Sequence, residues 1–332
     1  MQETDVLGAP YTRETIELAD DYEGPVVATL VRRRRSQDSQ RGAVLHVHGY
    51  CDYFFQTTMA EFYNRLGYDF YALDLRKYGR SLLPHQTPNF CLDIEEYYPE
   101  LDEAVDRIRT RDGHQNVVMS AHSTGGLFAA LWAAARLTGG QRVADAFVLN
   151  SPWLDLQGSF LLRTAGTEAL NQLGQRRPWA IVPRTVNGVY GETLHRDFNG
   201  EWTFDWAWKP RESFPVRAGW LRAIRKGHRA VHRGIDVGGP VLSLCSTASL
   251  SVPQWSEAAA CADTVLDVSQ IAKWSHQLGP EVTIVRVSGA IHDVLCSREQ
   301  VRTTAFGHVE RWLDYTMPNR DRPSRDRPSL DR

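Results

Sequence analysis

The chain has 332 residues, a formal net charge of -2 and 42% hydrophobic residues. These values are typical of a globular protein built as one large domain, or as a core with an inserted cap. The near-neutral charge gives no reason to expect a nucleic acid as partner. The one basic run, residues 32–35, is predicted to be a solvated turn between two edge strands.

Five cysteines are scattered along the chain, and their odd number argues against a framework of disulfides. We therefore expect reduced thiols and a cytoplasmic location. The first ten residues lack the apolar core of a signal peptide, and no apolar run reaches the length of a membrane span.

Apolar runs alternate with segments of helical spacing through the first half of the chain. Strands are predicted at residues 15–18, 25–31, 43–47, 68–73, 117–119 and 144–149, and helices at 58–66, 94–110 and 127–137. This alternation predicts an α/β fold, with a mostly parallel sheet covered by helices on both faces.

The alternation stops between residues 151 and 236, a segment with six of the ten tryptophans. We predict an inserted, mainly helical cap, whose tryptophans either line an acyl-binding pocket or form the cap's own core. Strands at 240–244 and 282–287 and helices at 268–278 and 298–315 then resume the pattern. The predicted organisation is a core in two parts (1–150 and 237–317), the cap, and a polar, disordered tail (318–332).

The stretch from Val117 to Gly126 carries the clearest functional signal. A short apolar strand leads into a sharp turn with Ser123 at its apex, and an alanine-rich helix follows. This order is typical of a nucleophile elbow, although Ala121 stands where the first glycine of G-x-S-x-G is usual. The helix N-terminus would direct N–H groups at an oxyanion beside Ser123. The alternative is an ordinary serine N-cap.

Other polar residues near the strand ends have simpler interpretations. His46 and His48 share one face of a strand and are expected to be structural, because no further ligands converge by spacing to make a metal site. His122 lies inside the elbow, where its side chain is expected to pack or to form a hydrogen bond. Asp52 and Asp293 are expected to hold their loops by hydrogen bonds. The sequence thus predicts neither a metal nor a cofactor.

Four motifs in this order resemble the alpha/beta-hydrolase fold, and within it the monoacylglycerol lipase and lysophospholipase branch. They read HVHGYCD, DLRKYGRS, AHSTGG and GAIHD, and the resemblance covers residues 26–313, with the cap poorly covered. It implies Ser123 as nucleophile and His292 as general base. It also implies an oxyanion hole formed by the backbone N–H groups of Tyr50 and Thr124. Lys77 stands where the family usually has glycine.

The catalytic acid departs from the family pattern. The family places an aspartate soon after the strand predicted at 240–244, but here residues 245–249 read CSTAS. Asp263, 29 residues before His292, is the favoured acid and resembles the missing phrase displaced by an insertion. Asp267 is the alternative, with helix N-capping as its structural role. Asp155 is a third, weaker option.

A serine activated by a histidine and a carboxylate would cleave carboxylic esters through an acyl-enzyme. The resemblance implies a small-molecule ester, such as a monoacylglycerol or a lysophospholipid, with an apolar acyl or alkyl group. Two alternatives stay open. One is an acyltransferase, lactonase or thioesterase with the same triad, and the other is a non-catalytic binding module on the same scaffold.

Overall fold

The computed structural model describes residues 2–35, 41–156, 171–183 and 188–318. The tail predicted to be disordered therefore lies outside the described residues, except for residue 318. None of the helices in these ranges is both long enough and apolar enough to cross a membrane.

Within the described residues, nine strands form a single sheet in the order β1-β2-β3-β5-β4-β6-β7-β8-β9. They are β1 (Glu3–Thr4), β2 (Thr12–Asp21), β3 (Gly24–Arg33), β4 (Gly42–Val47), β5 (Tyr68–Asp74), β6 (Val117–His122), β7 (Ala146–Asn150), β8 (Val241–Ser246) and β9 (Val282–Val287). The strands from β5 to β9 in this order pair in parallel, and β1 to β3 extend the sheet by antiparallel pairing. The carboxyl ends of the parallel strands therefore meet at one edge.

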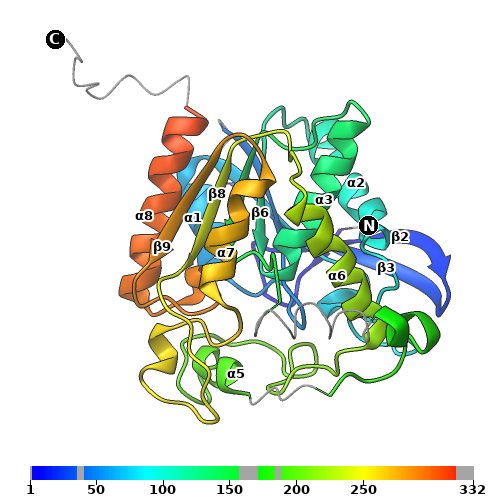
Figure 1. Ribbon diagram of the computed structural model, residues 1–332. Helices are drawn as coiled ribbons and strands as arrows, with labels where there is room; N and C mark the ends of the chain where they lie inside the picture. The colour runs from blue at the N-terminus through cyan, green and yellow to red at the C-terminus, as the bar shows by residue number, and fades with distance from the viewer. Residues whose placement is uncertain (1, 36–40, 157–170, 184–187, 319–332) are drawn as a thin grey trace.

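Helices cover both faces of the sheet (Figure 1). They are α1 (Thr57–Leu66), α2 (Tyr98–Asp106), α3 (Thr124–Thr138), α5 (Val189–Leu194), α6 (Ala218–His232), α7 (Val268–Ser275) and α8 (Glu299–Thr316). Buried side chains of α1 and α8 form one core, and those of α2, α3, α6 and α7 form the other. Neighbouring β4 residues Val44 and Leu45 enter opposite cores, as the period of a strand requires. The predicted α/β architecture is confirmed.

The helix predicted at 94–110 is divided into three parts. A 3-10 turn (Ile94–Tyr97), capped by Asp93, precedes α2, and a π-helical turn (Arg107–Arg111) follows it. Pro99 is the second residue of α2, and a proline has no N–H to continue a helix that began at residue 94. The break therefore has a local cause that apolar spacing does not reveal.

The prediction that residues 32–35 form a solvated turn is wrong for Arg32. Arg32 lies inside β3 opposite Tyr71 of β5 and is buried. Its guanidinium forms an ion pair with the buried carboxylate of Asp112. The prediction failed because β3 is two residues longer than its apolar run, and because Asp112 supplies the counter-charge from a distant loop.

The segment predicted as a cap contains two kinds of structure. Helix α6 packs against α3, and its apolar residues, such as Trp220 and Ile224, belong to the same core as the sheet. Residues 188–217, with the short helix α5, instead lie across the carboxyl edge of the sheet (Figure 1). The division of the chain at residues 150 and 236 stays a prediction.

The tryptophans of this segment also divide. Three of them cluster with aromatic residues of the cap and of the loop after β4: Trp202, Trp206 and Trp208. Trp153 and Trp220 instead reach the pocket above the sheet. Some of these tryptophans therefore belong to a core of the cap, and others line the pocket.

Candidate active site

Ser123 occupies a strained turn between β6 and α3. Its backbone has a φ of 52° and a ψ of -117°, a conformation that non-glycine residues rarely adopt. Three hydrogen bonds hold the turn: the Ser123 N–H donates to Asn150, and its carbonyl accepts from Gly126 and Trp153, at 2.9 to 3.0 Å. The surrounding chain thus fixes the strain, as is usual at functional sites.

Small residues around the turn allow three segments to approach one another. A Cβ on Gly125 would lie 2.2 Å from the carbonyl oxygen of His48, and one on Gly126 would lie 2.9 Å from Pro152. A Cβ on Gly49 would lie 3.0 Å from the Cβ of Ser123. The glycines therefore place the end of β4 directly beside the serine.

A chain of two hydrogen bonds links Ser123, His292 and Asp263. The Ser123 Oγ lies 2.9 Å from Nε2 of His292, and Nδ1 of His292 lies 2.9 Å from Oδ2 of Asp263. An ionised carboxylate can only accept, so Nδ1 carries the proton and Nε2 is the acceptor that faces the serine. All three residues are buried, at no more than 7% exposure.

Asp263 reaches the histidine because the chain leaves the end of β8 and returns to it. Residues 248–250 and Asp263 form an isolated bridge with two hydrogen bonds of 2.9 Å: Asp263 N–H to Ala248, and Leu250 N–H to Asp263. The second carboxylate oxygen of Asp263 accepts the N–H groups of Val265 and Leu266. The carboxylate is thereby fixed in orientation.

The other two candidate acids make different contacts. Asp267 is the N-cap of α7 and accepts the Ser269 N–H at 2.9 Å. Asp155 accepts a hydrogen bond from Arg225 of α6 at 2.8 Å. Of the three aspartates, the geometry brings Asp263 to His292.

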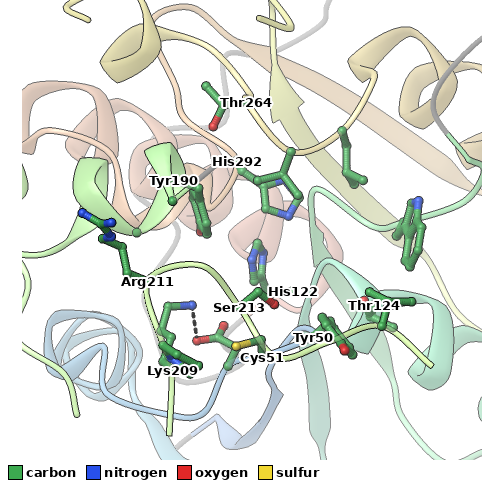
Figure 2. Close-up of a pocket in the computed structure, with 18 of the residues that line it drawn as sticks. Tyr50, Cys51, His122, Thr124, Tyr190, Lys209, Arg211, Ser213, Thr264 and His292 are labelled. Carbon is green, nitrogen blue, oxygen red and sulfur yellow. Dashed lines mark hydrogen bonds and ion pairs between the residues drawn. The ribbon is translucent and has the colours of Figure 1, made fainter. Parts of the chain in front are cut away.

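The two residues predicted for the oxyanion hole both line the pocket beside Ser123. Thr124 is the first residue of α3, whose first N–H groups have no acceptor within the helix. Tyr50 directly follows Gly49, and its ring packs on Trp220 with centroids 4.2 Å apart. Figure 2 shows Tyr50 and Thr124 on one side of the pocket and Lys209 and Arg211 on the other, with the His122 and His292 rings between them.

The pocket walls differ in chemistry. One wall is apolar and includes Trp153, Val216, Trp220, Val265 and Leu266. The other is polar and comes from the loop after β4 and from the cap, with Cys51, Asp52, Tyr190, Lys209 and Arg211. A substrate in this pocket would meet both apolar side chains and hydrogen-bonding groups close to Ser123.

Sequence reasoning missed the most buried charge of the pocket. The Lys209 ammonium lies 2.8 Å from Oδ1 of Asp52, and both side chains are buried. Burial opposes both charges, but each partner stabilises the other, so the pKa of Asp52 is lowered and the pKa of Lys209 is raised. The cap carries no motif around Lys209, and Asp52 was expected only to hold its own loop.

The remaining histidines have structural partners. His48 accepts the N–H of Leu75 at Nε2, and its Nδ1 lies 2.8 Å from the Gly49 carbonyl. His122 lies 3.1 Å from the Asn150 carbonyl through Nδ1, and burial lowers its pKa. Among the described residues, no group of three His, Cys, Asp or Glu side chains could hold a metal ion.

Comparisons with known proteins bear on the fold and on the first part of the chain. Residues 38–200 match the family model of the serine aminopeptidase S33 hydrolases, a range that includes Ser123 but ends before Asp263 and His292. No curated protein matches the chain by sequence.

Solved structures match over nearly the whole chain. A soluble variant of monoglyceride lipase from Saccharomyces cerevisiae, in complex with a substrate analogue, has a TM-score of 0.67 at 16% identity and covers 92% of this chain and 96% of its own. A monoacylglycerol lipase from Paleococcus ferrophilus has a TM-score of 0.59 at 19% identity, over 86% and 99% of the two chains. A carboxyl esterase from Bacillus coagulans has a TM-score of 0.63 at 14% identity, over 92% and 99%. The structural neighbours show that the chain has the alpha/beta-hydrolase fold, and the family match over residues 38–200 makes this part of it similar to the serine aminopeptidase S33 hydrolases.

Proposed function

We propose that the protein hydrolyses carboxylic esters through an acyl-enzyme on Ser123. The observation that carries this proposal is the pair of 2.9 Å hydrogen bonds that joins Ser123, His292 and Asp263 in a buried site. A serine hydroxyl is a poor nucleophile at neutral pH, and a histidine that accepts its proton during attack removes this difficulty.

Each residue has a role that follows from its position. His292 takes the proton of Ser123 at Nε2, while Asp263 holds the opposite nitrogen and stabilises the imidazolium. The N–H groups of Tyr50 and Thr124 bind the oxygen that becomes negative in the tetrahedral intermediate. His292 then protonates the leaving alcohol and activates the water that hydrolyses the acyl-enzyme.

The pocket lining indicates the class of substrate. The apolar wall, with Trp153, Val216 and Trp220, suits an acyl or alkyl group, as burial of such a group there removes it from water. Two of the structural neighbours are monoglyceride lipases, one of them bound to a substrate analogue. Small apolar esters, including monoacylglycerols and lysophospholipids, are the substrates we propose.

The family name raises the question of peptide cleavage. An aminopeptidase needs an acidic group to bind the free amino group of its substrate. Asp52 is the one acidic side chain among the described residues that line the pocket, and Lys209 already neutralises it. This pairing favours an ester over a peptide with a free amino terminus.

The experiment is labelling with a fluorophosphonate probe, followed by a hydrolysis screen. The wild type should be labelled and should cleave p-nitrophenyl esters or monoacylglycerols, while Ser123→Ala should do neither. Thioesters, lactones and added alcohol acceptors in the same screen separate the thioesterase, lactonase and acyltransferase alternatives. A wild type inert to the probe would favour the binding module. A cytoplasmic location is also a proposal, supported by five free cysteines.

A further inference from the structure

The cap contacts the loop that carries Tyr50 along its whole length. This loop comprises residues 49–53, and the contacting cap segment comprises residues 205–215. Three contacts join the two segments in antiparallel order. Tyr53 Oη accepts the Asp205 N–H at 2.7 Å, and Asp52 Oδ1 accepts a hydrogen bond from Lys209 Nζ at 2.8 Å. Tyr50 Oη donates to the Phe214 and Pro215 carbonyls, at 3.3 and 3.2 Å. The dashed line at Lys209 in Figure 2 marks the central contact.

Side-chain hydrogen bonds from the core of the protein hold the two ends of this loop, and between them the Tyr50 ring packs on the core residue Trp220. Before it, His48 binds the Gly49 carbonyl and the Leu75 N–H. After it, the Phe54 N–H donates to Asp74 at 3.0 Å. Between these anchors, Cys51 has a φ of 50°, a left-handed backbone that is strained for a non-glycine residue. The strained part of the loop is therefore the part that the cap contacts.

The cap segment is itself rigid where it meets the loop. Asp205 begins a turn in which its carbonyl accepts the N–H groups of Trp208 and Lys209, and its carboxylate accepts the N–H of Ala207. Lys209 extends from this turn, and its ammonium lies 5.5 to 5.8 Å from the centroids of three aromatic rings: Phe55, Tyr190 and Phe204. Its position is thus fixed from several sides before it reaches Asp52.

A buried ion pair of this kind is a poor source of stability. The cost of removing both charges from water commonly equals or exceeds their attraction, so two apolar residues would stabilise the fold as well. The pair instead fixes the orientation of the Asp52 side chain, because a charged hydrogen bond of 2.8 Å holds one carboxylate oxygen at one place. Asp52 lies two residues from Tyr50, so a fixed Asp52 also restricts the position of the Tyr50 backbone N–H.

We propose that Lys209 is a positioning residue, which acts through Asp52 to hold the 49–53 loop in the shape that presents the Tyr50 N–H to the oxyanion. The cap then completes the oxyanion hole as well as covering the substrate. This inference rests on the proposed hydrolase function. It requires that loss of Lys209 lowers kcat, since the hole acts in the transition state, and changes KM little.

The test compares Lys209→Met with the double variant Asp52→Asn/Lys209→Met and with Arg225→Met. Arg225 is a matched control: it is equally buried, and it forms a 2.8 Å ion pair with Asp155 away from the loop. For each variant, kcat and KM for a p-nitrophenyl ester, inhibition by an aryl boronic acid and the thermal midpoint are measured. The boronic acid forms a tetrahedral adduct on Ser123 and so reports on the oxyanion hole.

We expect Lys209→Met to lower kcat by about 10- to 100-fold, to weaken boronic acid inhibition to a similar degree and to leave KM within about threefold. The double variant should recover thermal stability, because no unpaired charge remains, but not kcat. Arg225→Met should lose stability and keep kcat within about twofold. A Lys209→Met protein with wild-type kcat, or a double variant that recovers kcat, overturns the inference while leaving the hydrolase function intact. A wild type that the fluorophosphonate does not label overturns the hydrolase function instead.

Discussion

Asp263 and His292 lie 2.9 Å apart although 29 residues separate them and the expected aspartate phrase after β8 is missing. The chain runs past the end of β8, makes an excursion and returns to pair beside residues 248–250. The excursion delivers a carboxylate to the place where a shorter loop would have put one directly.

The two neighbouring aspartates should therefore differ sharply on substitution. Asp263→Asn removes the carboxylate that fixes the tautomer of His292, and kcat should fall by roughly 10³- to 10⁴-fold. Asp267→Asn should keep kcat within about threefold, because asparagine still caps α7. Ester hydrolysis by both variants is the measurement, and equal losses would remove Asp263 from its proposed role.

Gly125 should not tolerate a side chain. An added Cβ would lie 2.2 Å from the His48 carbonyl oxygen, so Gly125→Ala must displace backbone and should lower the unfolding free energy by about 1–3 kcal/mol. Fluorophosphonate labelling should fall with it.

Gly307→Ala in α8 is the contrasting control. Its Cβ would meet only the end of Arg311 at 3.4 Å, and the change should stabilise the protein by about 0.5–1 kcal/mol. Chemical denaturation of both variants checks the pair, and a stable, active Gly125→Ala would contradict the close approach.

His46 should make stability depend on pH. Burial lowers its pKa to about 3, so it stays neutral in the fold at pH values where the unfolded chain binds a proton. Its contribution is complete above the unfolded pKa of about 6.5 and is lost as the pH falls toward 3. In this window His46→Asn should reduce the slope of unfolding free energy against pH by about 1.4 kcal/mol per pH unit. Denaturation of wild type and variant between pH 4 and 7 tests the sign, and identical slopes would be incompatible with a neutral His46.

Val216 should influence chain-length preference. It is buried in the apolar wall of the pocket, so Val216→Phe would fill space there. We expect kcat/KM for a long-chain p-nitrophenyl ester to fall by about tenfold or more relative to the acetate, because the longer chain no longer fits. The acetate serves as the internal control. Equal effects on both esters would place the acyl chain elsewhere.

The sheet and most helices could be predicted from the sequence, because their signals are local. The apolar run at residues 43–47 and the alanine-rich helix after Ser123 each carry their own periodicity, and the structure has both. The boundary between the 3-10 turn and α2 was not predicted, since it depends on the single residue Pro99. Arg32 was misjudged because its burial depends on Asp112, 80 residues away.

The site divides in the same way. Ser123 and His292 stand in recognisable motifs at strand ends, and the family resemblance implied that they meet. The contact of Asp52 with Lys209 spans 157 residues and joins the core to a segment with no motif, so only coordinates reveal it. The cap is the part of the molecule that is hardest to predict from the sequence, because its contacts with the core are distant along the chain and it has no motif of its own.

Lys77 is a position where redesign of this protein by family consensus would lower its stability. Its backbone is left-handed, with a φ of 64°, at a position where glycine is usual. A consensus substitution to glycine would relax that backbone. It would also delete the fully buried ammonium that lies 2.7 and 2.6 Å from the carboxylates of Asp21 and Glu23. The cost of the orphaned charges would exceed the relief, so this position should be exempt from consensus substitution unless Asp21 and Glu23 are replaced with it.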